Sequence, residues 1–193
     1  MEDLTILLQN HWLLILLILI ILFAIWKFVN IYNSIIVAEN EIDNMKGAID
    51  SLLKMKFNLI DNLVNIVKGY MKYERETLEK IVRLRNKVDK EKDFIKRNEI
   101  DREINPYLRT LFIQVENYPE LKANQNVLDL QRTLYDIESQ IAAARRGYND
   151  AIVNYNNIIE TFPSNIVANM FNFKPKKVFR LDESRDENIY ITL

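Results

Sequence analysis

The chain has 193 residues, with 26 Lys and Arg, 27 Asp and Glu, one histidine and no cysteine. Charge this close to balance predicts no concentrated basic face, so nucleic acid is not an expected partner. The absence of cysteine excludes disulfides, thiolate nucleophiles and sulfur-ligated zinc, but it does not identify the compartment.

The most informative segment is an apolar run near the N-terminus. No charged side chain occurs from Leu4 to Trp26, and Trp12 to Trp26 is one block of apolar residues. A helix from Leu4 to Trp26 reaches roughly 34 Å, enough to cross a hydrocarbon core of about 30 Å. Because Glu2 and Asp3 precede it and no small-residue cleavage pattern follows, we expect an uncleaved membrane anchor over residues 1–27.

The distribution of basic residues predicts an orientation. No Lys or Arg precedes the run, whereas Lys27 follows it at once and Lys46 lies further on. This bias favours an N-terminus outside the cell and the larger domain in the cytoplasm.

The residues after the anchor have a helical pattern. Since no Pro or turn cluster separates Trp26 from Ile31, we expect the transmembrane helix to continue into the first helix of a bundle. Gly69 marks its expected end. The apolar stripe steps by four and three and slips by one position between Leu52 and Leu53. It comprises Ile31, Ile35, Ala38, Ile42, Met45, Ile49 and Leu52, then Leu53, Phe57, Ile60, Val64, Val67 and Met71.

A second helix is predicted over Glu74 to Arg97. Its mixed charges from Lys87 to Asp93 indicate a solvated face, with a docking surface as the alternative. Asn105-Pro106 is expected to kink the chain or to open a further short helix, which Tyr118-Pro119 ends. The inward residues are Leu78, Ile81, Val88 and Ile95 in the second helix, and Leu108, Leu111, Phe112 and Val115 in the third.

The last long helix has the most regular pattern, over Val127 to Phe162, and Pro163 is expected to end it. A short apolar piece, Ile166 to Phe173, follows. The apolar stripe comprises Val127, Leu130, Leu134, Ile137, Ile141, Ala144, Tyr148, Ala151, Tyr155, Ile158 and Phe162. The predicted polar side comprises Arg132, Glu138, Arg145, Arg146 and Asp150.

These elements predict an all-α fold, in which an N-terminal transmembrane helix continues into an antiparallel up-and-down bundle of about four long helices over residues 28–173. Residues 174–193 form a basic and aromatic, then acidic, tail that we expect to be partly disordered. The segment Lys174 to Arg180 suits the anionic cytoplasmic leaflet or a groove on a partner. An aromatic clasp that closes the end of the bundle is an equal alternative.

Two stretches resemble a known family. YPELKANQNVLDLQRTLYDIESQIAAARRGYNDAIVNYNNIIETFP, from Tyr118 to Pro163, is similar to the YP-acidic-LKAN turn, the Leu-Gln helix and the YN…YN…FP ending of the bacterial LemA family. NLIDNLVNIVKGYMKYERETLEKIVRLRN, from Asn58 to Asn86, resembles the segment of that family that leads through Val-Lys-Gly-Tyr into a Thr-Leu-Glu helix. The resemblance extends over Tyr32 to Phe179. The chain has Asn58 and Asp61 where the family usually has Asp and Pro.

The resemblance implies a single-pass anchor in the bacterial cytoplasmic (inner) membrane and a cytoplasmic bundle of four antiparallel helices. It also implies relatives such as MamQ, which serve the formation of membrane organelles, and no established enzyme activity.

Residues that carry chemistry are scarce. The single histidine, His11, lies at the mouth of the anchor, so a Ser-His or Cys-His site in the domain is excluded, and we interpret His11 as an interfacial residue beside Trp12. Metal binding would need carboxylates alone, and their pairs lack an accompanying Glu-x-x-His. No glycine-rich phosphate loop is present. We therefore expect no catalytic, cofactor-binding or metal-binding residues and no cofactor. The carboxylate pairs considered are Glu39 with Asp43 and Glu99 with Glu103.

Two further motifs have structural explanations. The Tyr118 to Asn124 turn is expected to join two helices, with Asn124 capping the second. The repeated Tyr-Asn pairs, Tyr148-Asn149 and Tyr155-Asn156, predict core tyrosines with hydrogen-bonded hydroxyls, in preference to a ligand pocket.

The pattern as a whole predicts a non-enzymatic, membrane-anchored scaffold. Its expected partners are the lipid bilayer, further copies of the chain and other membrane proteins, with Arg145 and Arg146 on an exposed face that serves assembly. The alternative is a monomeric adaptor or regulator of a membrane protease or envelope-stress system, with the C-terminal tail as its docking element. A hydrolase that uses helix carboxylates is a weaker third hypothesis.

Overall fold

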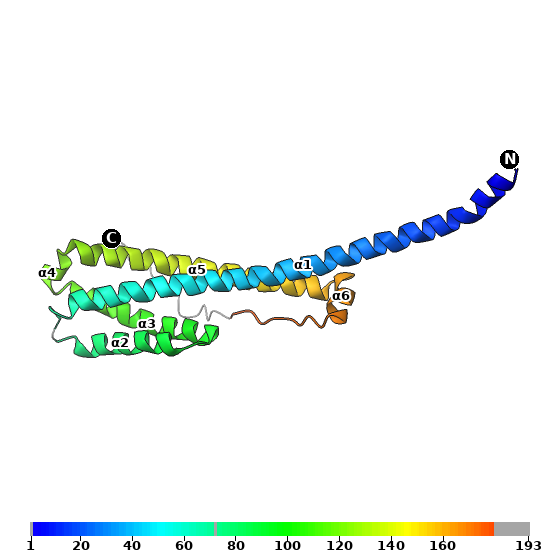
Figure 1. Ribbon diagram of the computed structural model, residues 1–193. Coiled ribbons are helices and arrows are strands. Elements are labelled where there is room, and N and C mark those ends of the chain that lie inside the picture. The colour runs from blue at the N-terminus through cyan, green and yellow to red at the C-terminus, as the bar shows by residue number, and fades with distance from the viewer. Residues whose placement is uncertain (1, 72, 180–193) are drawn as a thin grey trace. The chain divides into compact units, whose positions relative to one another are not determined.

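A computed structural model describes residues 2–71 and 73–179, and it describes side chains from His11 onward. These residues form helices and no strand, which confirms the all-α prediction (Figure 1). The helices are α1 (Glu2–Val67), α2 (Arg75–Lys90), α3 (Phe94–Val115), α4 (Pro119–Lys122), α5 (Gln125–Glu160) and α6 (Ser164–Met170).

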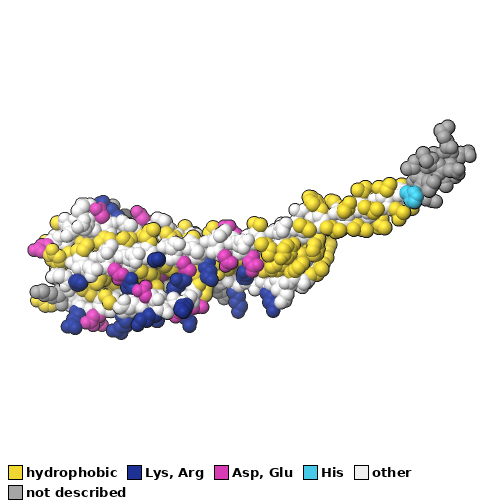
Figure 2. Space-filling model, in the orientation of Figure 1, with side chains coloured by type: hydrophobic (Ala, Val, Ile, Leu, Met, Phe, Trp, Pro, Cys, Tyr) yellow, Lys and Arg dark blue, Asp and Glu magenta, His cyan; other side chains and the backbone are white. Residues whose placement is uncertain are grey.

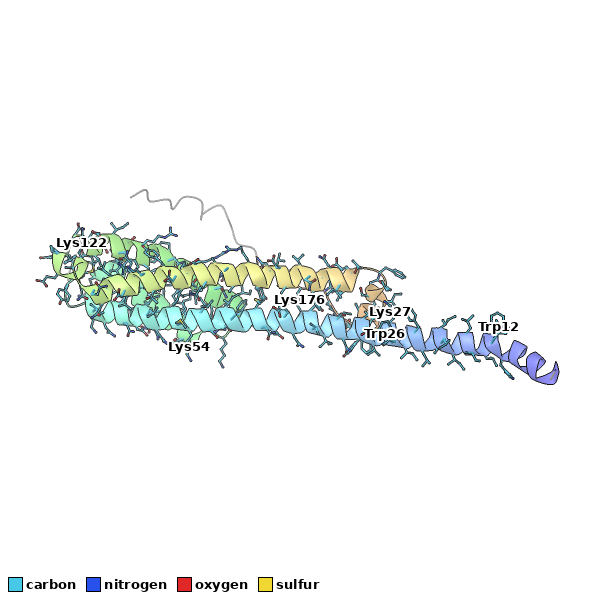
Figure 3. The ribbon with its side chains drawn as sticks, turned by 90° about the horizontal axis from the view of Figure 1, so that it is seen from above. Trp12, Trp26, Lys27, Lys54, Lys122 and Lys176 are labelled. Carbon is cyan, nitrogen blue, oxygen red and sulfur yellow. The ribbon has the colours of Figure 1, made fainter. Side chains whose placement is uncertain are left out.

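Helix α1 is one unbroken element of 66 residues, so the apolar helix does continue into the first bundle helix. Trp12 and Trp26 mark the two ends of the apolar block (Figure 3). Every large apolar side chain between them is 47–59 % exposed, a contiguous apolar surface that lipid would cover. Among the described residues, α1 is the one helix long and apolar enough to cross a membrane.

The chain falls into two compact units, which are described separately. The first consists of Met1–Ile42 and Asp150–Val178, and it holds the start of α1, the end of α5, and α6. The second consists of Asp43–Asn149 and Phe179–Leu193, and it holds the end of α1, helices α2 to α4, and most of α5.

The second unit is an up-and-down arrangement of four long helical segments, from α1, α2, α3 and α5 (Figure 1). One apolar core connects them, and the predicted stripes supply most of it. Leu53 is 2 % exposed whereas Leu52 is only partly buried, so the predicted slip in the α1 stripe is confirmed. Helix α1 ends at Val67, two residues before Gly69.

The prediction of one helix from Glu74 to Arg97 is wrong. Helix α2 ends at Lys90, and α3 begins at Phe94. The break has a local cause, because the Asp93 side chain accepts a hydrogen bond from the Lys96 backbone N–H at 2.9 Å and thereby caps the new helix.

A further prediction fails with this break. Ile95 was expected to face inward and is 41 % exposed, since it follows the phase of α3 instead of that of α2. Of the two alternatives for Pro106, a kink or the start of a helix, the second is wrong, because Pro106 lies inside α3. The predicted core residues after it are nevertheless buried: Leu108, Leu111, Phe112 and Val115.

The turn between α3 and α5 agrees with the sequence. Pro119 occupies the first turn of α4. The Asn124 side chain accepts hydrogen bonds from the backbone N–H groups of Asn126 at 3.0 Å and Val127 at 3.4 Å, which confirms the predicted cap. The Tyr118 hydroxyl donates a hydrogen bond to the Glu74 carboxylate and so joins this turn to the start of α2.

In the first unit, α1 packs against α5 and α6. Tyr155 is 1 % exposed and its hydroxyl donates to the Lys174 carbonyl at 3.3 Å, as predicted for the tyrosines of this motif. Phe162, expected to complete the α5 stripe, is 80 % exposed because α5 ends at Glu160. The buried apolar residues are Ile35, Ala38, Ile42, Ala151, Ile152, Tyr155, Ile159, Val167 and Ala168.

The Tyr118–Glu74 contact predicts a dependence on alkaline pH. The hydrogen bond to Glu74, supported by desolvation, raises the pKa of Tyr118 from 10.0 to about 12. The folded state therefore holds the phenol proton more tightly than the unfolded state does. The resulting stabilisation is complete below pH 10 and is lost as the pH rises from 10 toward 12.

An ultraviolet titration of tyrosinate in the wild type and in Tyr118→Phe tests this. The difference between the two curves should show one tyrosine that ionises near pH 12. A difference curve with its midpoint near pH 10 would contradict the assigned hydrogen bond.

Candidate functional site

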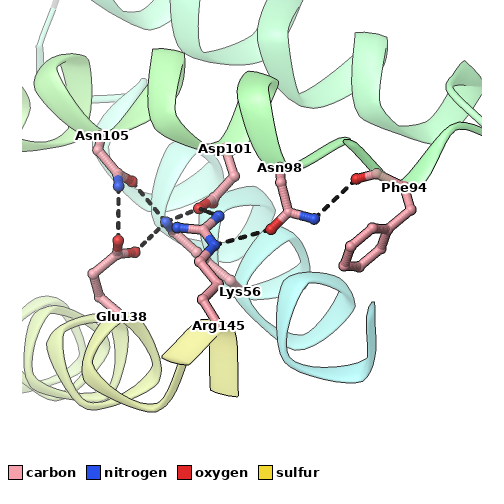
Figure 4. Close-up of polar contacts among 7 residues, drawn as sticks. All are labelled: Lys56, Phe94, Asn98, Asp101, Asn105, Glu138 and Arg145. Atoms are coloured by element: carbon pink, nitrogen blue, oxygen red, sulfur yellow. Dashed lines mark hydrogen bonds and ion pairs between the residues drawn. The ribbon is translucent and has the colours of Figure 1, made fainter. Parts of the chain in front are cut away.

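The most unusual feature of the second unit is a buried ammonium group. Lys56, on α1, is 1 % exposed. Its Nζ donates to Asp101 Oδ1 at 2.7 Å, to Asn105 Oδ1 at 2.6 Å and to the Glu138 carboxylate (Figure 4). An ammonium has three N–H donors, so each proton has an acceptor.

The same carboxylate binds a second cation. Asp101 is fully buried, and its Oδ2 accepts from Arg145 at 3.0 Å. Arg145 Nε also donates to Asn98 Oδ1 at 2.9 Å, and Asn98 Nδ2 donates to the Phe94 carbonyl at 2.9 Å. Two cations and two carboxylates thus balance in one cluster. We call this cluster the polar core: Lys56, Asn98, Asp101, Asn105, Glu138 and Arg145.

The polar core corrects an interpretation of the sequence. Arg145 and Glu138 were assigned to the exposed polar side of the last helix. Arg145 is only 5 % exposed, and Glu138 accepts hydrogen bonds from both Lys56 and Asn105. Arg146, in contrast, is exposed as predicted.

A sequence signal for the polar core exists in the phase of the stripes. Each member lies on a four-three series that also contains inward apolar residues of its own helix. In α3 the series runs Phe94, Asn98, Asp101, Asn105, Leu108, Phe112, Val115; in α5 it runs Leu134, Glu138, Ile141, Arg145, Tyr148; in α1 it runs Leu53, Lys56, Ile60, Leu63. A search for apolar residues alone passes over these positions.

Chemically, this arrangement holds helices together instead of presenting a reactive group. The contacts join α1, α3 and α5 at one level of the bundle, and the charges neutralise one another. Burial of such a pair gives little net stability, but the removal of one partner leaves an uncompensated charge. We infer that the polar core fixes the register of these helices.

The second candidate site is the place where the C-terminal segment binds to α5. In the first unit, Asn156 Nδ2 donates to the Lys176 carbonyl at 2.8 Å, and the Lys176 N–H donates to Asn156 Oδ1 at 2.9 Å. The Lys176 ammonium pairs with Glu39 at 2.8 Å and lies 5.1 Å from the centre of the Tyr155 ring. Both the backbone and the ammonium group of Lys176 therefore bind groups of the same chain.

The second unit repeats the arrangement. Asn149 Nδ2 donates to the Phe179 carbonyl, and the Phe179 N–H donates to Asn149 Oδ1, both at 2.8 Å. Phe179 is 8 % exposed and its ring lies 5.2 Å from the Arg102 guanidinium carbon. The described part of the tail thus contacts its own chain in an intramolecular clasp, the leaflet and the partner groove stay predictions, and Arg180 and the acidic end lie outside the described residues.

In each unit, the asparagine of one Tyr-Asn pair binds both backbone groups of one residue of the C-terminal segment. The sequence analysis did not assign this function to the asparagines.

Two of the four carboxylates considered for metal binding form ion pairs. Glu39 pairs with Lys176, and Glu103 pairs with Lys80 at 3.2 Å. Within residues 11–71 and 73–179, no group of three or more His, Cys, Asp or Glu side chains could hold a metal ion. A cleft of about 400 Å³ in the second unit contains the 2.6 Å ion pair between Asp50 and Arg97.

Comparison with known proteins identifies the family. The sequence profile of the LemA family matches residues 45–192, which is more than half of the chain. The chain belongs to the LemA family. Its similarity extends to Protein LemA of Metamycoplasma hominis, with 29 % identity over 152 residues, which cover 78 % of this chain and 69 % of that protein.

The LemA match includes the polar core and all of the second candidate site except Glu39. Every residue of the polar core and both Tyr-Asn pairs fall within residues 45–192. The apolar block from Trp12 to Trp26 precedes the matched region.

Removal of the buried ammonium should destabilise the fold. We expect Lys56→Met to lower the free energy of unfolding by about 3–5 kcal/mol, because Asp101 and Glu138 lose their shared cation. Lys54→Met is the matched control, since Lys54 is exposed two residues earlier on the same helix (Figure 3). Thermal unfolding followed by circular dichroism measures both, and equal midpoints would contradict a structural role of the polar core.

Removal of the asparagine side chains should release the C-terminal segment. In Asn149→Ala/Asn156→Ala, the amides of Lys176 and Phe179 should exchange hydrogen at least tenfold faster, because four hydrogen bonds of about 1 kcal/mol each are lost. Asn154→Ala, at an exposed position of α5, is the control. Unchanged protection in the double variant would show that the clasp does not hold in solution.

Proposed function

We propose that this LemA-family protein is a non-enzymatic, single-pass membrane-anchored scaffold, whose helical bundle self-associates and organises other membrane proteins or membrane shape. The observation that carries the proposal is the continuity of α1. One helix contains the exposed apolar block and also Lys56 of the polar core, so the anchor and a bundle helix are the same element. No flexible linker separates them.

The use of charge in the bundle supports a structural role. The buried Lys56 pairs with Asp101 and Glu138, and Arg145 pairs with Asp101. These charges therefore hold helices together. A general acid or base needs a proton that it can exchange with a substrate. In the polar core the protons of the ammonium are already donated to three fixed acceptors.

The proposed location is the bacterial cytoplasmic membrane, with the segment before the span outside and the bundle in the cytoplasm. Lys27 supports this orientation, because it follows the apolar block directly and its Nζ lies 5.5 Å from the centre of the Trp26 ring (Figure 3). A cation and an indole together at one end of a span are typical of an interfacial anchor.

Two exposed apolar side chains in the second unit suit self-association. Ile113 is 71 % exposed and Tyr135 is 53 % exposed. The two side chains lie on neighbouring helices, since the Tyr135 ring packs on Phe112 at a centroid distance of 5.9 Å. An anchor that confines copies to one plane raises their local concentration, so a modest patch suffices for assembly.

The mass of the full-length protein in mild detergent tests the proposal. Light scattering, corrected for bound detergent, should give one discrete assembly larger than a monomer. Ile113→Glu should shift it toward monomer, because a charge would be buried at the contact, whereas Lys54→Glu should not. Arg146→Glu, on the exposed side of α5, tests whether the face predicted from the sequence serves assembly.

A monomeric wild type would contradict the scaffold proposal. It would favour the alternative, an adaptor or regulator of a membrane protease or envelope-stress system, and crosslinking in cells would then identify the protein that it holds.

A further inference from the structure

Helix α6 carries an exposed apolar patch in the first unit. Phe162 is 80 % exposed, Ile166 53 %, Met170 67 % and Phe171 49 %. Ile166 and Met170 are four residues apart and lie on one side of the short helix, Val167 and Ala168 are buried on the other, and Phe162 and Phe171 lie just outside its two ends. Figure 2 shows this apolar surface around α6. We call these four residues the α6 patch.

The α6 patch lies close to the end of the membrane span. The Phe171 ring contacts Phe28 and Tyr32 of α1, with centroid distances of 6.0 and 4.7 Å. Phe28 is two residues beyond Trp26, a rise of about 3 Å, and Tyr32 is six residues beyond it, about 9 Å. The polar headgroup layer extends roughly 5–8 Å outside the hydrocarbon core on each side. Phe171 is therefore at the depth of that layer, at the end of α6 that carries Met170.

The chain after α6 fixes the patch against α1. Asn172 has a positive φ of 59°, the left-handed conformation that ends many helices. The Phe173 N–H donates to the Ala168 carbonyl at 3.0 Å, and the Asn172 N–H donates to the Asn169 carbonyl at 3.3 Å. This pair of bonds is the Schellman arrangement, and it brings Phe173 within 6.1 Å of the Tyr32 ring.

Exposed cations accompany the patch. Lys27 is exposed at the end of the span, and Lys174 is exposed directly after Phe173. Apolar and aromatic side chains flanked by lysine are typical of segments that lie in the interface of an anionic membrane.

We propose that the α6 patch is immersed in the interfacial layer of the same leaflet from which α1 emerges, so that the protein contacts the bilayer at two places. The inference rests on the proposed anchoring by α1. Phospholipid is the occupant because the patch continues the apolar surface of the span through Phe28 and Tyr32. A second contact would hold the first unit at a defined tilt to the membrane.

Site-directed spin labelling of the full chain tests this, and the absence of cysteine means that no native thiol has to be removed. The variants are Ile166→Cys and Met170→Cys in the patch, Leu19→Cys in the apolar block and Met55→Cys as the aqueous control. Met55 is 54 % exposed on the same α1 helix. Each labelled protein is placed in vesicles of phosphatidylethanolamine and phosphatidylglycerol, and the accessibility of the nitroxide to oxygen and to a water-soluble nickel chelate is measured.

The proposal predicts an oxygen-to-nickel accessibility ratio at Ile166 and Met170 that is several-fold higher than at Met55 and approaches that at Leu19. A high ratio at Leu19 with Ile166 and Met170 equal to Met55 would overturn the inference and leave the anchoring intact. A low ratio at Leu19 would overturn the anchoring and the inference together. Spin–spin broadening at Ile166 that disappears on dilution with unlabelled protein would show that a second copy covers the patch, which also overturns it.

Discussion

The buried Lys56 ammonium is the interaction on which the bundle depends. A cation that is 1 % exposed is tolerated only where acceptors surround it, and here they come from two other helices. Asp101 then satisfies Arg145 with its second oxygen. Because these distances close only when the helices are aligned at one level, the contacts specify register more than they add stability. Apolar stripes alone would allow one helix to shift by one turn along its neighbours. The ion pairs and hydrogen bonds of the polar core would be broken by such a shift.

This constraint acts on the helix that also carries the apolar block. Lys56 and the apolar block belong to the same unbroken α1. In the first unit, the Tyr-Asn pair at residues 155 and 156 secures the C-terminal segment to α5, and the aromatic contacts of Phe171 secure α6 to α1. These contacts support the scaffold that we propose.

The sequence predicted apolar patterns well and polar contacts poorly. Uninterrupted stripes predicted α1 and α5, because period and length reflect burial directly. The break at Asp93 was missed because a single capping residue decided it within a run of mixed charge. The buried role of Arg145 was missed because an arginine at an inward position is read from the sequence as exposed until its partner, forty-four residues away, is known. The same holds for Asn149 and Asn156, whose partners are backbone groups that carry no side-chain signal.

A double-mutant cycle on Lys56 and Asp101 tests the central claim most directly. The free energy of unfolding is measured for the wild type, Lys56→Met, Asp101→Leu and the double variant. If the two charges are paired in the folded core, the double variant is less destabilised than the sum of the single variants, with a coupling energy of about 2 kcal/mol or more. A coupling energy near zero, with each single variant as stable as the wild type, would show that the polar core does not hold the helices in register.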